Sequence, residues 1–78
     1  MELIDLYLDA LRDELEFAFK KFPPIRSYHE GYAVIKEEVD ELWDDIKANK
    51  GGEAAASHEA LQIAAMAIRY IHDVGGLK

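Results

Sequence analysis

Two residue pairs, Pro23-Pro24 and Gly51-Gly52, divide this chain of 78 residues into three stretches. Each stretch carries apolar residues at steps of three and four, which is the pattern of an amphipathic helix. Proline lacks an amide proton and disfavours helical geometry in the residue before it, so the first helix ends there. Paired glycines supply the left-handed conformation that ends the second helix. The sequence therefore predicts an all-α fold in one domain, residues 1–78, with helices at about 2–22, 28–49 and 53–73.

The second predicted helix has a defined start. Ser27 and Glu30 fit the capping box, in which a serine hydroxyl and a glutamate three residues later satisfy free backbone amides. Gly31 lies inside the same helix, where glycine costs about 1 kcal/mol relative to alanine. We therefore expect another helix or a ligand to approach the backbone of Gly31 closely.

The apolar content exceeds what three short helices need within one protomer. The third helix is apolar over most of its circumference, and such a helix is buried. The first helix also has a wider apolar face than one partner helix would cover. Half of the residues are hydrophobic, although a chain of this size buries only a modest fraction of its surface alone. We expect a homodimer that covers the surplus and completes a helical bundle.

The charge and the absence of cysteine exclude several classes of function. The formal net charge is −7. Nucleic-acid binding recruits basic patches, so direct binding to nucleic acid is disfavoured. A small phosphorylated substrate remains compatible if metal ions stand between the carboxylates and the phosphates. The lack of cysteine excludes a disulfide framework and a thiolate metal site.

The N-terminal residues lack the basic region and the uninterrupted apolar run of a signal peptide. No apolar stretch is long enough to span a membrane. We therefore expect a cytoplasmic location and no membrane partner.

Residues 36–45 form an acidic segment in which six of the ten residues are Asp or Glu. At about 100° per residue, the apolar residues of this region fall within roughly 60° of one another. This predicted core stripe consists of Ile35, Val39, Leu42 and Ile46. Glu38 and Glu41 lie beside the stripe, three residues apart and therefore neighbours on one face. A solvated charge run would lie opposite the core, so the two carboxylates form a candidate divalent-cation site, with a solvated face as the alternative.

The third predicted helix carries one narrow polar stripe. The stripe consists of Glu59, Gln62, Arg69 and Asp73, with Met66 among them. A nearly all-apolar helix with such a stripe is either a surface helix whose polar stripe faces solvent or a central helix that lines a site.

These residues carry a resemblance to a known family. Glu37-Glu38-Val39-Asp40-Glu41 matches a Glu-Glu-x-x-Glu motif, and Glu59-Ala60-Leu61-Gln62 stands where a second motif, Glu-x-x-Asp, is expected on the following helix. The pattern resembles the MazG-like, all-α nucleoside triphosphate pyrophosphohydrolases, and is most similar to their short phage and bacterial members. The two motifs and the helix order cover most of the chain from His29 to Asp73.

The resemblance implies a helical dimer or a dimer of dimers, with Mg²⁺ (or Mn²⁺) as cofactor and a nucleotide bound through the metal. It implies that Glu38, Glu41 and Glu59 are the metal ligands and the catalytic carboxylates. Glu37 would be an additional carboxylate close to the metal. Gln62 occupies the place of the family's aspartate, where its neutral amide could still coordinate the metal or donate a hydrogen bond to the nucleotide.

Charge on the departing pyrophosphate could be met by a cation. Lys36, Lys47 and Arg69 are the candidates for this substrate contact, and the sequence does not choose among them. Asp45, one turn after Glu41, could assist the metal, although solvent exposure is favoured.

Other conspicuous side chains have simpler interpretations. Trp43 and Tyr32 could stack on a base, but packing in the core or in a dimer contact is favoured. Histidine can act as a base or a ligand, but the three histidines are scattered over helix ends, so capping or surface roles are favoured. They are His29, His58 and His72.

Two classes of function therefore remain. The first is a Mg²⁺-dependent pyrophosphohydrolase that cleaves a nucleoside or deoxynucleoside triphosphate to a monophosphate and pyrophosphate. The second is a catalytically weak or inactive MazG-like helical dimer that acts as a binding or regulatory module. The retained glutamates favour the first class, and Gln62 favours the second.

Overall fold

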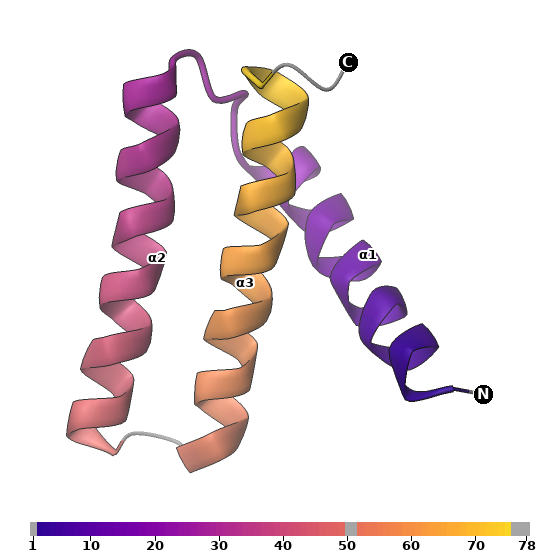
Figure 1. Cartoon of the computed structure of the whole chain (residues 1–78), viewed down its shortest axis with the longest axis vertical. Helices are drawn as coiled ribbons and strands as arrows, with labels where there is room; N and C mark the ends of the chain where they lie inside the picture. Colours follow the sequence, from indigo (N-terminus) through magenta and orange to yellow (C-terminus); the bar gives the residue numbers. More distant parts are fainter. Residues whose placement is uncertain (1, 50–51, 76–78) are drawn as a thin grey trace.

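The computed structural model describes residues 2–49 and 52–75. Within these residues the chain forms three helices and no strand: α1 (Leu3–Lys21), α2 (Tyr28–Ala48) and α3 (Gly52–Asp73) (Figure 1). The predicted all-α fold and its three helices are confirmed. None of the described helices combines the length and the apolar content needed to cross a membrane.

Helix α3 is the central element. It packs against α2 along its length and against the C-terminal half of α1, which diverges from the other two helices toward its N-terminus (Figure 1). No Cα atom of α1 lies within 8 Å of a Cα atom of α2. The molecule is flat, with extents of 35 × 33 × 20 Å. A flat arrangement of three helices leaves much apolar surface uncovered.

The start of α2 follows the capping box in one half only. The Ser27 hydroxyl accepts a hydrogen bond from the Glu30 amide at 3.0 Å. The Glu30 carboxylate, however, accepts from the Arg26 amide at 3.1 Å, one residue before the expected partner. Both bonds satisfy free amides at the helix start.

The left-handed residue that ends α2 is Asn49 and not a glycine. Asn49 has φ 52° and ψ 40°, and its amide donates to the carbonyls of Asp45 and Ile46. Asparagine tolerates this conformation better than other residues with a Cβ. Gly52, with φ 63°, already begins α3, and Gly51 lies outside the described residues.

Gly31 lies on the face of α2 that packs against α3, close to the α1–α2 linker. A Cβ atom at this position would overlap the ring of Tyr70 on α3 and lie 3.3 Å from Ile25 Cγ2. The expectation of a close approach is confirmed, and the approaching element is a helix. This contact offsets the helix stability that is lost when glycine stands in place of alanine.

The hydrophobic core is small. Four hydrophobic side chains among the described residues are buried: Ala18, Ile25, Ala65 and Met66. Partly buried side chains of Val34, Ile35, Tyr70 and Val74 pack against them.

The predicted core stripe of α2 is half wrong. Ile35 and Leu42 are partly buried, but Val39 and Ile46 are 44% and 51% exposed. Helix α2 is rotated so that the flank beside the stripe, including Glu38 and Asp45, faces α3. Only the Ile35 and Leu42 edge of the apolar stripe is therefore partly buried, and the Val39 and Ile46 edge is exposed.

The polar stripe of α3 is not a solvent-exposed face. Arg69 is 2% exposed, and Glu59 and Gln62 are half-buried. The side chain of Asp73 is 6% exposed. Of the two alternatives from the sequence, the structure supports the central helix, with its polar stripe directed at neighbouring elements.

Candidate metal centre

Three glutamates from α2 and α3 converge. Glu38, Glu41 and Glu59 can each place one carboxylate oxygen within 4.8 Å of the other two. Glu38 and Glu41 are neighbours on α2 because residues three apart share a helix face. Glu59 reaches them because α2 and α3 run side by side (Figure 1). The structure thus brings together the three residues that the sequence singled out first.

Two of these carboxylates have an oxygen that is buried without a hydrogen-bond partner among the described residues. These atoms are Glu38 Oε2 and Glu59 Oε2. Burying a polar group without a partner costs roughly 1–3 kcal/mol, and more for a charged one. Glu41 is exposed, so solvent and solutes reach the cluster from its side.

Electrostatics disfavours three ionised carboxylates in this place. Burial raises the pKa of Glu38, and the charges of Glu41, Glu59, Glu37 and Glu14 raise it further. Burial and the charges of Glu41 and Asp45 also raise the pKa of Glu59, although His58 opposes this rise. A cation bound among the carboxylates would favour their ionised forms.

Glu37 and Gln62 lie outside this three-carboxylate cluster. Glu37 lines a cavity between α2 and the α1–α2 linker. Gln62 lines a smaller hollow of about 70 Å³ between α1 and α3, and it shares this hollow with Glu38. The predicted metal contacts of Glu37 and Gln62 stay predictions.

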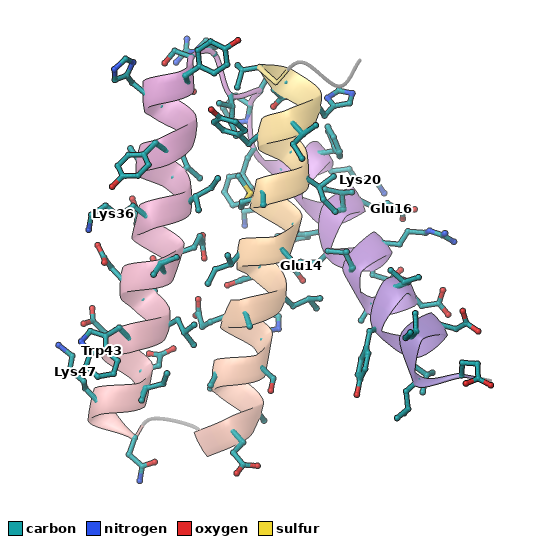
Figure 2. All side chains as sticks on the ribbon, in the orientation of Figure 1. Glu14, Glu16, Lys20, Lys36, Trp43 and Lys47 are labelled. Atoms are coloured by element: carbon teal, nitrogen blue, oxygen red, sulfur yellow. The ribbon has the colours of Figure 1, made fainter. Side chains whose placement is uncertain are left out.

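The three candidate cations lie elsewhere. Lys36 pairs with Asp40 at 3.1 Å, and this hydrogen bond and charge raise the pKa of Lys36. Lys47 lies 3.6 Å from Asp44, and both lysines project from the face of α2 that points away from α3 (Figure 2). Arg69 is buried between α1 and α3, where it donates to the Ala18 carbonyl at 2.6 Å. Substrate contact by Lys36 or Arg69 stays a prediction.

The sequence did not single out Glu14 of α1, which is half-buried and electrostatically coupled to Glu38. Figure 2 shows Glu14 between α1 and α3, whereas Glu16 and Lys20 lie on the outer side of α1. A signal was present, because Glu14 lies four residues before the buried Ala18 and shares its helix face.

The remaining candidates are at the surface. Trp43 and Tyr32 are exposed in the protomer, so neither packs in its core. His29 and His58 are exposed, and His72 is exposed but lies 2.9 Å from Asp73 Oδ1 through its Nδ1 atom. Asp45 is half-buried beside Glu59, closer to the cluster than the favoured interpretation from the sequence placed it.

Comparisons of the chain with protein families, with curated proteins and with solved structures find no match.

Proposed function

We propose that this protein is a divalent-cation-dependent nucleotide pyrophosphohydrolase of the MazG-like type. It hydrolyses the bond between the α- and β-phosphates of a nucleoside or deoxynucleoside triphosphate and releases a monophosphate and pyrophosphate. The observation that carries the proposal is the convergence of Glu38, Glu41 and Glu59, with one buried, unpaired oxygen on each of Glu38 and Glu59. The nucleotide pool of the cytoplasm is the setting that the proposal assumes.

The donor set suits a hard cation. Mg²⁺ and Mn²⁺ prefer carboxylate oxygens and keep several positions for water and substrate phosphates. An ion held there supplies positive charge to the triphosphate and lowers the pKa of a bound water. Glu38 and Glu59 are half-buried and each shields one oxygen, Oε2, from solvent, whereas the exposed Glu41 leaves an open side for substrate. The protein itself carries a net charge of −7, so a triphosphate needs the cation in order to approach.

The proposal includes a homodimer, and two uncovered apolar faces support it. On α1, Ile4 and Tyr7 are 66% and 64% exposed although they share a helix face with the buried Ala18. They are exposed because α1 has diverged from α3 at this level (Figure 1). Exposed apolar residues surround them on the first turns: Leu3, Leu6 and Leu8.

The second uncovered face runs along α2. Its residues fall within roughly 60° of one another at about 100° per residue. They are Tyr28, Tyr32, Val39, Trp43 and Ile46, all exposed. Apolar surfaces of this kind mark interaction sites. A second copy of the chain offers matching apolar faces, and two-fold symmetry lets each face be covered. A dimer of dimers would use both faces.

A direct assay tests the enzymatic proposal. Purified protein with Mg²⁺ or Mn²⁺ is incubated with a panel of ribo- and deoxynucleoside triphosphates, and pyrophosphate release is measured. We expect release that depends on the cation and is lost in Glu38→Gln and Glu59→Gln. Asp44→Asn removes an exposed carboxylate from the same helix and serves as the control. No release from any nucleotide by a folded protein would contradict the proposal.

The second candidate is a catalytically weak or inactive helical dimer that binds a ligand or regulates a partner. The placement of the three candidate cations favours it. Lys36 and Lys47 are on the outer face of α2, and Arg69 is buried in a pair with Asp73, so none of them is directed at the glutamates. The neutral Gln62 agrees with this candidate as well.

A further inference from the structure

A groove lies between α1 and α2 because both helices pack on α3 and not on each other. Two adjoining cavities occupy it, and they share Phe22, Glu38 and Met66. The larger cavity, next to the α1–α2 linker, has a volume of about 260 Å³. Ligand pockets usually have roughly 300–1,000 Å³, so this cavity suits a single ring system better than a whole nucleotide.

The walls of the larger cavity are apolar. The side chains of Phe22, Pro23 and Ile25 come from the end of α1 and the linker, Val34 comes from α2, and Met66 comes from α3. Ile25 and Met66 belong to the buried core and are 5% and 8% exposed. Apolar walls of this kind favour an apolar or aromatic group over a charged one.

Three carboxylates supply the polar part of the lining: Glu30, Glu37 and Glu38. Glu30 already accepts a hydrogen bond from the Arg26 amide. Glu37 makes no hydrogen bond or ion pair with any other described residue, and Glu38 Oε2 is buried without a partner. Ionised carboxylates only accept hydrogen bonds. No side chain of this lining is a cation or a strong donor, so a ligand that brings N–H donors would complement it.

We propose that this cavity binds a nucleobase that carries an exocyclic amino group, such as cytosine or adenine, with the amino group donating to Glu37. The inference rests on the proposed function, because Glu38 belongs both to this cavity and to the metal centre. The cavity and the metal centre are therefore neighbours that share the Glu38 side chain. A base with a carbonyl in place of the amino group would put an acceptor against a carboxylate, and both would lose hydrogen bonds to water.

Nucleosides test the inference without the metal and without hydrolysis. Cytidine and uridine differ at one exocyclic group of the ring, as do adenosine and inosine. Each is titrated into metal-free protein while the methyl NMR signals of Met66 and Val34 are followed. We expect the amino-bearing member of each pair to bind about tenfold more tightly, since a hydrogen bond to a charged group has about that effect or more. The Met66 and Val34 signals should shift.

Glu37→Gln provides the matching variant. Glu37 is exposed, so its replacement leaves the fold intact, and an amide can both accept and donate. The preference for the amino-bearing nucleoside should then fall to about twofold or less. Glu16→Gln removes one exposed negative charge from the outer side of α1 (Figure 2) and should leave the preference unchanged.

Three results would overturn the inference: equal binding within each pair, shifts that map away from Met66 and Val34, or no binding because a second copy of the chain fills the groove. Pyrophosphate release without base preference would overturn this inference and leave the proposed function standing. Base preference without pyrophosphate release would overturn the proposed function and leave this inference standing.

Discussion

Arg69 and Asp73 form a buried ion pair, with Nε and Oδ2 3.1 Å apart and side chains 2% and 6% exposed. Each residue also binds the backbone of another element. Arg69 donates to the carbonyl of Ala18 on α1, and Asp73 accepts from the amide of Ile25 in the linker at 2.8 Å. The Arg69 guanidinium also lies 4.5 Å from the centre of the Phe19 ring. One turn of α3 thus binds both the end of α1 and the linker.

We predict that Arg69→Met lowers the free energy of unfolding by about 3 kcal/mol, because it removes one partner of a buried ion pair and the hydrogen bond to the Ala18 carbonyl, while Asp73 keeps its hydrogen bonds from the Ile25 amide and His72. Lys36→Met breaks the exposed pair with Asp40 and should leave the free energy of unfolding almost unchanged, because solvent screens such a pair. Urea denaturation at one fixed protein concentration measures both. Equal losses in the two variants would show that the buried pair has no special role.

The uncovered apolar faces predict association. Sedimentation velocity should report a dimer or a larger species at micromolar concentration. Ile4→Gln and Trp43→Gln should weaken association at least tenfold, because burying such a side chain is worth about 1.5–3 kcal/mol and a two-fold interface contains it twice. Arg12→Gln, on an exposed position of α1, is the control. A stable monomer of wild-type protein at this concentration would refute the dimer.

Cation binding should stabilise the fold through the glutamate cluster. A cation at about 100 times its dissociation constant adds about 2.7 kcal/mol, and each kcal/mol raises Tm by roughly 4–8 °C in a domain of this size. At that saturation, Mg²⁺ or Mn²⁺ should therefore raise the Tm of thermal unfolding by about 11–22 °C. Glu38→Gln and Glu41→Gln should diminish the rise, and Asp44→Asn should preserve it. An unchanged Tm in wild type would mean that the carboxylates are only solvated.

In metal-free protein, two sets of carboxylates should change the free energy of unfolding with pH in opposite directions. The raised pKa values of Glu38 and Glu59 mean that the folded state binds protons more tightly than the unfolded state. Stability should therefore fall as the pH rises above the ordinary glutamate value of 4.5. Glu38→Gln should flatten this part of the curve of unfolding free energy against pH.

Asp73 acts in the other direction. Burial raises the pKa of Asp73, but hydrogen bonds from His72 and the Ile25 amide and the charge of Arg69 outweigh it and hold the pKa below its ordinary value of 3.8. The stability that this carboxylate contributes is present above that value and is lost as the pH falls further. Denaturation at a series of pH values in the presence of a chelator measures both effects on the free energy of unfolding. A free energy of unfolding that only rises from acid to neutral pH would contradict the effect predicted for Glu38 and Glu59.

Gln62 supplies a test of the catalytic proposal. Gln62→Asp introduces an anionic oxygen beside Glu38, so it should tighten Mg²⁺ binding and leave pyrophosphate release equal or higher. Gln62→Asn has the same shape without the charge and should not tighten binding. Titration calorimetry and the release assay give the two readouts. If wild type and Gln62→Asp both fold and dimerise but hydrolyse no nucleotide, the binding-module candidate replaces the enzyme.

The helices and their ends could be predicted from the sequence because local interactions determine them. Ser27 caps α2 through its own hydroxyl, and α1 ends at Lys21, just before the prolines, as proline geometry requires. The close approach at Gly31 was also predictable, since only a tight contact explains a glycine there. The proximity of Glu38 to Glu41 follows from helix geometry alone.

The tertiary structure decided which neighbour each face meets. Hydrophobic periodicity marks an apolar side of a helix but not the angle at which a partner contacts it, so Val39 and Ile46 were expected in the core and are exposed. The sequence likewise predicted that the polar residues of α3 form a single stripe with one role. Packing divides it, because α2 covers the end that carries Glu59 while α1 and the linker cover the end that carries Arg69 and Asp73. One end became a candidate metal site and the other a buried ion pair, a difference that depends on contacts between residues far apart in the chain.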